Sequence, residues 1–145
     1  MGRVKVSTVI DAPPSLVWAD IKDLASHIEW MDDALRIDFT SSQTSGVGAA
    51  YACDTAVGPF HVTDRIEVTE WDEGRRIGIR HRGLVKGTGR FTIRRAMGGR
   101  TRFTWEEELS FPWWVGGRLA SVVGTRMLKR VWRRNLANLR SRLES

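Results

Sequence analysis

The sequence predicts an α+β fold in which a curved antiparallel sheet closes on one long C-terminal helix. Strand-like segments at about 47–57, 60–71, 75–83, 86–96 and 101–111 follow one another with only glycine-containing turns between them. Turns this close together, with no helical pattern between them, indicate an antiparallel meander rather than a parallel sheet. Glycines inside the strands favour a sheet that bends sharply, and the segment after Pro112 has the composition of a basic helix. A bent sheet closed by a helix has an interior, which we expect to be an apolar pocket.

The residues before this meander predict two further strands with two short helices between them. An alternation with a period of two indicates a half-buried strand over 3–11. Two prolines end that strand, and proline is tolerated in the first turn of the helix that we expect over 15–22. A second short helix is expected over 24–29, and an extended segment follows over 34–40. The residues on one face of this segment are Leu35, Ile37 and Phe39.

The C-terminal segment predicts a helix from about Val115 to Glu144. Such a helix would be about 45 Å long at 1.5 Å per residue, and we expect a break or bend at Gly116-Gly117 and at Gly124 because glycine disfavours a helix interior. Its apolar stripe must be covered, and the concave side of the sheet is the only large apolar surface left in the chain. The stripe consists of Leu128, Val131, Trp132, Leu136, Leu139 and Leu143.

Length and composition predict a single domain over residues 1–145. A chain of 145 residues that is 41% hydrophobic is large enough to bury a core. Its one cysteine, Cys53, allows no intramolecular disulfide, and three scattered histidines lack metal-ligand spacing, so we expect no metal. No P-loop or dinucleotide fingerprint occurs, and we expect no cofactor. Neither a membrane span nor a long apolar signal region is seen, which favours a cytoplasmic protein.

Positive charge is concentrated in the last element. From Arg118 onward the chain holds eight Lys and Arg residues against one acid, whereas the preceding residues hold 15 basic and 16 acidic side chains. This helix is therefore either a docking surface for anionic lipid, acidic protein or nucleic acid, or a solvated outer face.

Three segments carry a family resemblance. They are the corner Ile10 to Trp18 with the later Asp23 and Trp30, the hairpin Val68 to Ile77, and the turn and strand Gly99 to Trp105. These segments resemble the START-like, or SRPBCC, superfamily, in its polyketide cyclase/dehydrase and lipid-transport branch, and the resemblance covers essentially the whole chain. It implies a helix-grip fold, in which a seven-stranded antiparallel sheet wraps the terminal helix around a hydrophobic cavity. Members bind lipids, sterols, polyketides or plant hormones and some are cyclases, but the family has no shared catalytic motif to carry over.

Polar side chains at inward-facing strand positions are the candidates for a site, because a buried polar group without a partner is costly. Glu107 shares the parity of Phe103 and Trp105, so it would point inward among aromatic rings. There it would bind a hydroxyl or amine of a ligand, act as a general base, or pair with an arginine. His81 shares a face with Ile77 and Ile79 and is either a proton-transfer group in the cavity or a histidine at the surface.

Further residues complete the expected pocket. Tyr51 is the only tyrosine, and its hydroxyl would bind a carbonyl or phenolic group or serve packing. Trp30 lies where the short helices return to the sheet and would line the mouth of the cavity, whereas Trp105 and Phe91 are large enough to fill it. The residues expected to contact a ligand are Trp30, Leu35, Tyr51, Ile66, Ile79, His81, Phe91, Trp105, Glu107 and Val122.

Trp113 and Trp114 are candidates for transient contact with an anionic membrane. Adjacent tryptophans beside glycines and a basic helix suit an interface where arginines meet headgroups. The alternative is that both rings cap the open end of the sheet as ordinary core.

Three functional classes follow. The first is a protein that sequesters or transports a hydrophobic small molecule, such as a lipid, polyketide or aromatic compound, through apolar burial with a few orienting polar groups. The second is a polyketide cyclase, aromatase or dehydrase that uses an inward-facing Glu107 or His81 for proton transfer. The third is an interaction module that recruits protein or RNA through the basic helix, although we expect nucleic acid not to be the partner.

Overall fold

The structure, a computed structural model, describes residues 2–57, 60–110 and 117–144, without the side chains of residues 57, 60 and 117–123. Within these ranges, the strands and helices follow one another in the order that the sequence predicts, apart from shifts of a few residues at their ends. In chain order the elements are β1 (Gly2–Ile10), α1 (Pro14–Ile21), the 3₁₀ helix η1 (Leu24–Glu29), β2 (Ala34–Phe39), β3 (Ala50–Val57), β4 (Phe60–Asp72), β5 (Arg76–Arg82), β6 (Lys86–Arg95), the 3₁₀ turn η2 (Met97–Gly99), β7 (Thr101–Ser110) and α2 (Gly117–Glu144).

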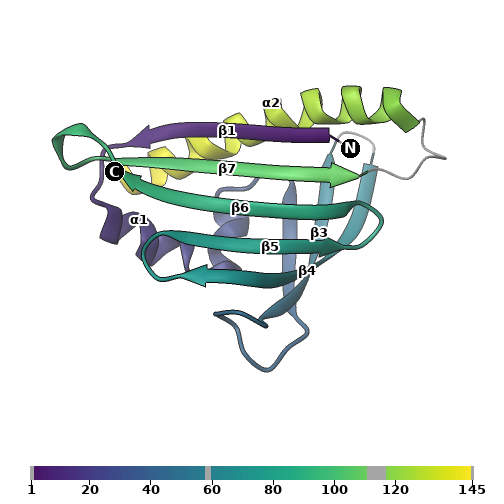
Figure 1. The fold of residues 1–145 in the computed structure, drawn as a ribbon, viewed down its shortest axis with the longest axis horizontal. Helices are drawn as coiled ribbons and strands as arrows, with labels where there is room; N and C mark the ends of the chain where they lie inside the picture. Colours follow the sequence, from purple (N-terminus) through teal and green to yellow (C-terminus); the bar gives the residue numbers. More distant parts are fainter. Residues whose placement is uncertain (1, 58–59, 111–116, 145) are drawn as a thin grey trace.

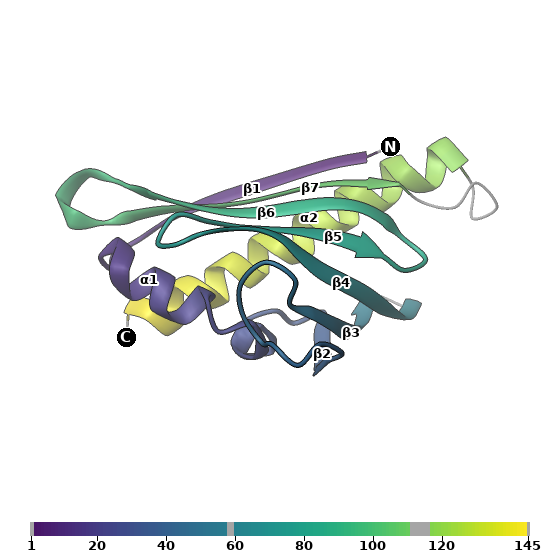
Figure 2. The ribbon, with the colours of Figure 1, turned by 60° about the horizontal axis from the view of Figure 1, so that its bottom comes forward.

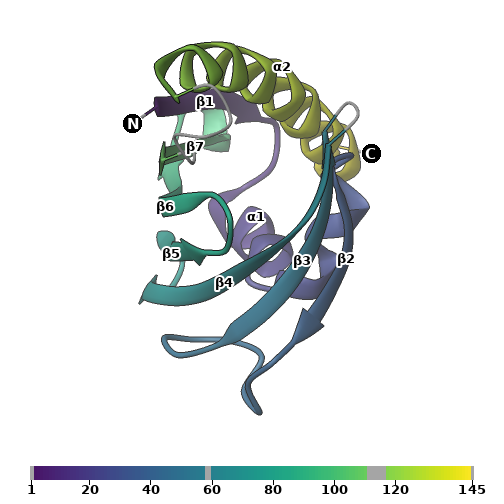
Figure 3. The same ribbon diagram turned by 90° about the vertical axis from the view of Figure 1, so that its right-hand side faces the viewer.

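The described strands form one antiparallel sheet of seven strands. Their order is β1-β7-β6-β5-β4-β3-β2, so β2 to β7 form a meander and β1 pairs with the last strand. Figure 3 shows the strands arranged in an arc, with β1 and β2 at its two ends. The predicted curved antiparallel sheet is therefore confirmed, and its concave side faces the helices.

Helix α2 lies across the open side of this arc (Figures 2 and 3). Its apolar stripe faces the sheet, because Trp132, Leu136 and Leu139 are all buried. The helix continues without interruption through Gly124, so the predicted break at that residue is wrong. A glycine in a helix interior costs only about 1 kcal/mol, which burial of an apolar stripe of this size readily offsets. Gly116 lies outside the described residues.

Strand β2 contains a bulge that overturns one sequence expectation. Ala34 pairs with Thr55 and Arg36 with Asp54, so Leu35 is an extra residue in the ladder. Its side chain is 54% exposed, and the predicted inward position of Leu35 is wrong. After the bulge the parity agrees with prediction, since Ile37 and Phe39 pack against the core.

Part of the interior is filled by aromatic side chains. The rings of Trp105 on β7 and Trp132 on α2 are stacked, with centroids 4.2 Å apart and planes 12° apart. Phe91 and Trp30 pack edge-on against Trp105, with centroids 5.3 and 5.9 Å away. This aromatic cluster joins the sheet to α2 and to Trp30, the residue that directly follows η1.

Candidate functional site

A chain of three ionisable side chains crosses the concave face of the sheet. Asp64, His81 and Glu107 come from β4, β5 and β7 respectively. The His81 ring lies between the two carboxylates: Nδ1 is 2.5 Å from Asp64 Oδ2, and Nε2 contacts Glu107 Oε1. The predicted inward positions of His81 and Glu107 are confirmed, since their side chains are only 9% and 4% exposed.

Two glycines of β6 make this contact possible. His81 and Glu107 lie on strands that flank β6, where Gly87 pairs with His81 and Gly89 with Glu107. Neither glycine has a side chain to separate the two groups. A Cβ atom at position 89 would lie 2.7 Å from Cγ of Glu107, closer than real Cβ contacts. Because β6 has no side chains at these two positions, His81 and Glu107 contact each other across it.

The two carboxylates keep His81 protonated. Burial alone would lower the pKa of His81, but Glu107 and Asp64 outweigh that effect and raise the pKa to about 10. At neutral pH the ring is thus an imidazolium that donates one N–H to each carboxylate. Trp105 Nε1 donates to the second oxygen of Glu107 at 2.7 Å. The other oxygen of Asp64, Oδ1, is buried and has no hydrogen-bond partner among the described residues.

Tyr51 and Cys53 of β3 project into the same space. Cys53 pairs with Asp64 across the strands, and Tyr51 lies two residues earlier on the same face. Burial raises the pKa of Tyr51, and Cys53, Glu107 and Asp64 raise it further. Burial likewise raises the pKa of Cys53 to about 11, so its thiol stays protonated and is a poor nucleophile at neutral pH. The Tyr51 side chain is buried, and none of the hydrogen bonds among the described residues involves its hydroxyl.

Asp33 and Asn135 form a second buried polar contact, which sequence reasoning missed. Asn135 of α2 donates from Nδ2 to Asp33 Oδ1 at 2.7 Å and accepts the backbone N–H of Asp32 at 2.9 Å. Burial raises the pKa of Asp33 against the opposing effect of the hydrogen bond from Asn135, and Glu107 lies near enough to raise it further. The available signal was an amide at position 135 inside the apolar stripe, between Trp132 and Leu136.

The other expected pocket residues surround this polar group to different degrees. Tyr51, Ile66, Trp30 and Trp105 are buried, and Ile79 and Phe91 are half-buried against the core. The indole Nε1 of Trp30 is buried without a hydrogen-bond partner among the described residues. The structure does not bring Leu35 to the interior. The remaining expected ligand contact, Val122, lies outside the described side chains, as do Trp113 and Trp114, the candidates for membrane contact.

A surface groove of about 580 Å³ opens beside this interior. Lys22, Ser45, Trp71 and Glu73 contribute to its walls, together with Phe39. Phe39 also packs edge-on against Tyr51, with ring centroids 5.8 Å apart. The Phe39 ring therefore lies between the groove and Tyr51.

A metal-binding cluster and a membrane-spanning helix are both absent from the part of the chain that the structure describes. Within it, no three or more His, Cys, Asp or Glu side chains are grouped so as to hold a metal ion. Across the same residues, no helix combines the length and apolar character needed to cross a membrane.

Together, the curved sheet, the closing helix and the partly polar interior define a helix-grip protein of the START-like class. The chain belongs to the polyketide cyclase/dehydrase and lipid-transport family, whose model matches residues 1–144. The resemblance seen in the sequence is thereby confirmed. None of the curated proteins matches the sequence.

Solved structures share this fold at low sequence identity. TTHA0849 from Thermus thermophilus is 18% identical, with a TM-score of 0.84 over 97% of this chain and 96% of that one. A START superfamily protein from Mycobacterium smegmatis is 13% identical, with a TM-score of 0.78 over 99% and 98%. The Zhui aromatase/cyclase from Streptomyces sp. R1128 is 16% identical, with a TM-score of 0.72 over 96% and 88%. Likeness at these identities shows the fold alone.

Proposed function

We propose that the protein binds a hydrophobic small molecule in its interior and sequesters or transports it. The observation that carries this proposal is the chain Asp64–His81–Glu107 on a concave face that also presents many apolar side chains. Burying charged groups costs more than filling the same space with apolar side chains. Binding of a ligand by these groups would explain why charged side chains occupy the interior despite this cost.

Binding would follow from apolar burial, with the polar groups fixing orientation. Each square ångström of apolar surface removed from water contributes roughly 25 cal/mol, and the interior offers aromatic and aliphatic walls in Trp105, Phe91 and Ile79. The groove at Phe39 is the candidate route to this interior, because that ring contacts both the groove and Tyr51.

Native mass spectrometry of the purified protein tests this proposal directly. We expect an adduct of a few hundred daltons that organic solvent removes, and uptake of a neutral fluorescent lipid by the extracted protein. An extracted protein that takes up no lipid, fatty alcohol or aromatic probe would refute the carrier function.

An enzymatic role is the second candidate, favoured by the position of His81 between two carboxylates. As an imidazolium, His81 carries a proton on both ring nitrogens and donates a hydrogen bond from each. It therefore has no lone pair with which to act as a base. The free Oδ1 of Asp64 is the available base, and the imidazolium would return a proton. Such a pair would suit proton removal and dehydration in a ring closure.

Turnover of a polyketide-like substrate separates the two functions. If the protein is an enzyme, Asp64→Asn and His81→Gln should each lower kcat by at least about 100-fold, the usual contribution of a general acid or base. Full turnover in both variants would eliminate this mechanism and leave the carrier function.

A further inference from the structure

The polar group in the interior carries a net negative charge. Two carboxylates, Asp64 and Glu107, share one imidazolium, and the carboxyl group of Asp33 lies beside Glu107. No Lys or Arg is buried among the side chains that the structure describes. The protein's own described residues therefore leave about one negative charge in the interior without a cation, which is costly in a low-dielectric environment.

We propose that the ligand is a hydrophobic amine whose ammonium group binds at Asp64 Oδ1, on the face of the sheet that Asp64 shares with Tyr51. This inference rests on the proposed binding function and names the chemical class of its ligand. Asp64 Oδ1 is a buried acceptor that lacks a partner among the described residues. Tyr51 is 5% exposed, faces the same carboxylates and adds an oxygen that can accept a further N–H.

Apolar side chains around this position suit an alkyl or aryl body. Ile66 lies opposite Tyr51 on β4, and the Phe39 ring packs edge-on against Tyr51 with centroids 5.8 Å apart. An anionic headgroup at the same place would face Asp64 and Glu107 with like charge. The same site should therefore reject fatty acids and lipid phosphates.

Three ligands with one alkyl chain test this selectivity: dodecylamine, 1-dodecanol and dodecanoic acid. Binding to the whole protein at neutral pH is followed by intrinsic tryptophan fluorescence and by native mass spectrometry. We expect the amine to bind at least about tenfold more tightly than the alcohol, as hydrogen bonds to charged groups exceed neutral ones, and the acid most weakly. Equal or tighter binding of the alcohol or acid would overturn the amine assignment and leave the binding function intact. Failure of all three to bind would overturn the amine assignment, and the binding function would fall with it only if the neutral fluorescent lipid and an aromatic probe also failed to bind.

Substitution of single carboxylates locates the site. In Asp64→Asn the amine should lose its advantage over the alcohol, because the amide presents no negative charge to the ammonium group. Glu108→Gln is the matched control, because Glu108 lies on β7 but on its exposed side, next to Glu107. Glu107→Gln serves as a second test if thermal unfolding shows Asp64→Asn to be misfolded. An unchanged preference for the amine in a folded Asp64→Asn or Glu107→Gln protein would contradict the assigned position.

Discussion

At the scale of single residues, the site depends on two glycines as much as on its ionisable side chains. Gly87 and Gly89 keep β6 bare where His81 and Glu107 approach each other. Glu107 is fully engaged, with one oxygen bound to His81 and the other to Trp105. Any group that displaces this carboxylate therefore breaks two buried hydrogen bonds at once.

Gly89→Ala should lower the free energy of unfolding by about 1–3 kcal/mol, as overpacking of a core usually does. The added Cβ would lie 2.7 Å from Glu107 Cγ and force that side chain away from its partners. Urea unfolding measures the effect, with Thr88→Ala on the exposed side of β6 as the control. In the double variant Gly89→Ala/Glu107→Ala the penalty for Gly89→Ala should shrink. A penalty independent of Glu107 would contradict this explanation.

The charge state of His81 predicts a pH dependence of stability. The ring holds its proton to about pH 10 when folded, whereas the ordinary pKa is 6.5. The folded state thus binds more protons than the unfolded state between these values, so the free energy of unfolding falls as pH rises through this window. The full contribution is present below pH 6.5.

Urea titrations of wild type and His81→Gln between pH 6 and 10 check this expectation. The difference in unfolding free energy between the two proteins should decrease with rising pH. A constant difference would mean that His81 is neutral in the folded protein.

At the scale of elements, sequence patterns predicted the order of strands and the faces they present. Alternation with a period of two placed His81 and Glu107 inside, and turn residues bounded each strand. Leu35 was misplaced because a single extra residue reverses parity, and nothing in the local sequence marks the bulge. The partner of His81 was not predictable, because pairing across strands depends on registers that alternation does not specify.

The contact between α2 and the segment after η1 depends on Asn135. Asn135→Ala should lower the free energy of unfolding by about 1–3 kcal/mol, because it leaves the buried Asp33 carboxyl and the part-buried Asp32 N–H without this partner. Asn138→Ala is the control: this half-buried amide, one turn later, bonds to Trp30 O and Asp32. Thermal unfolding should show the larger loss for Asn135. Equal losses would show that the buried amide has no special role.

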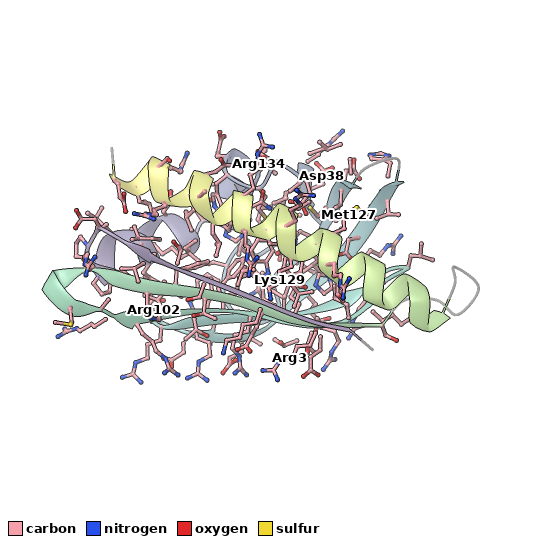
Figure 4. All side chains as sticks on the ribbon, turned by 90° about the horizontal axis from the view of Figure 1, so that it is seen from above. Arg3, Asp38, Arg102, Met127, Lys129 and Arg134 are labelled. Carbon is pink, nitrogen blue, oxygen red and sulfur yellow. The ribbon has the colours of Figure 1, made fainter. Side chains whose placement is uncertain are left out.

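At the scale of the whole molecule, positive charge is not confined to the last helix. Exposed basic residues also alternate along the outer face of the sheet: Arg3, Lys5, Arg80, Arg82, Lys86, Arg90, Arg94 and Arg102. Three of them, Arg3, Arg82 and Arg90, form salt bridges with Glu106, Glu67 and Glu70. Figure 4 places Arg3 beside the sheet and Arg134 beside α2, on opposite sides of the molecule. Contact of the basic helix with an anionic membrane stays a prediction, and its test must distinguish these two surfaces.

Access to the interior should depend on Phe39. Replacing it with alanine removes the ring between the groove and Tyr51, so bound ligand should dissociate several-fold faster with a smaller change in affinity. Stopped-flow exchange of a fluorescent ligand measures the rate. Leu35→Ala, an exposed position on the same strand, should leave it unchanged. Identical exchange rates in all three proteins would place the route elsewhere.

The pairing of β1 with β7 has a consequence for how the chain folds. Gly2 lies opposite Leu109 and Ile10 opposite Thr101, so the first of these strands to leave the ribosome has its sheet partner in the last. Contacts between such distant residues slow folding, because a long loop must close before they form. During synthesis β1 cannot pair until β7 has emerged. Its inward-facing Val4 and Val6 stay exposed to solvent until then. Nascent chains are therefore most exposed to aggregation and chaperone binding during that interval.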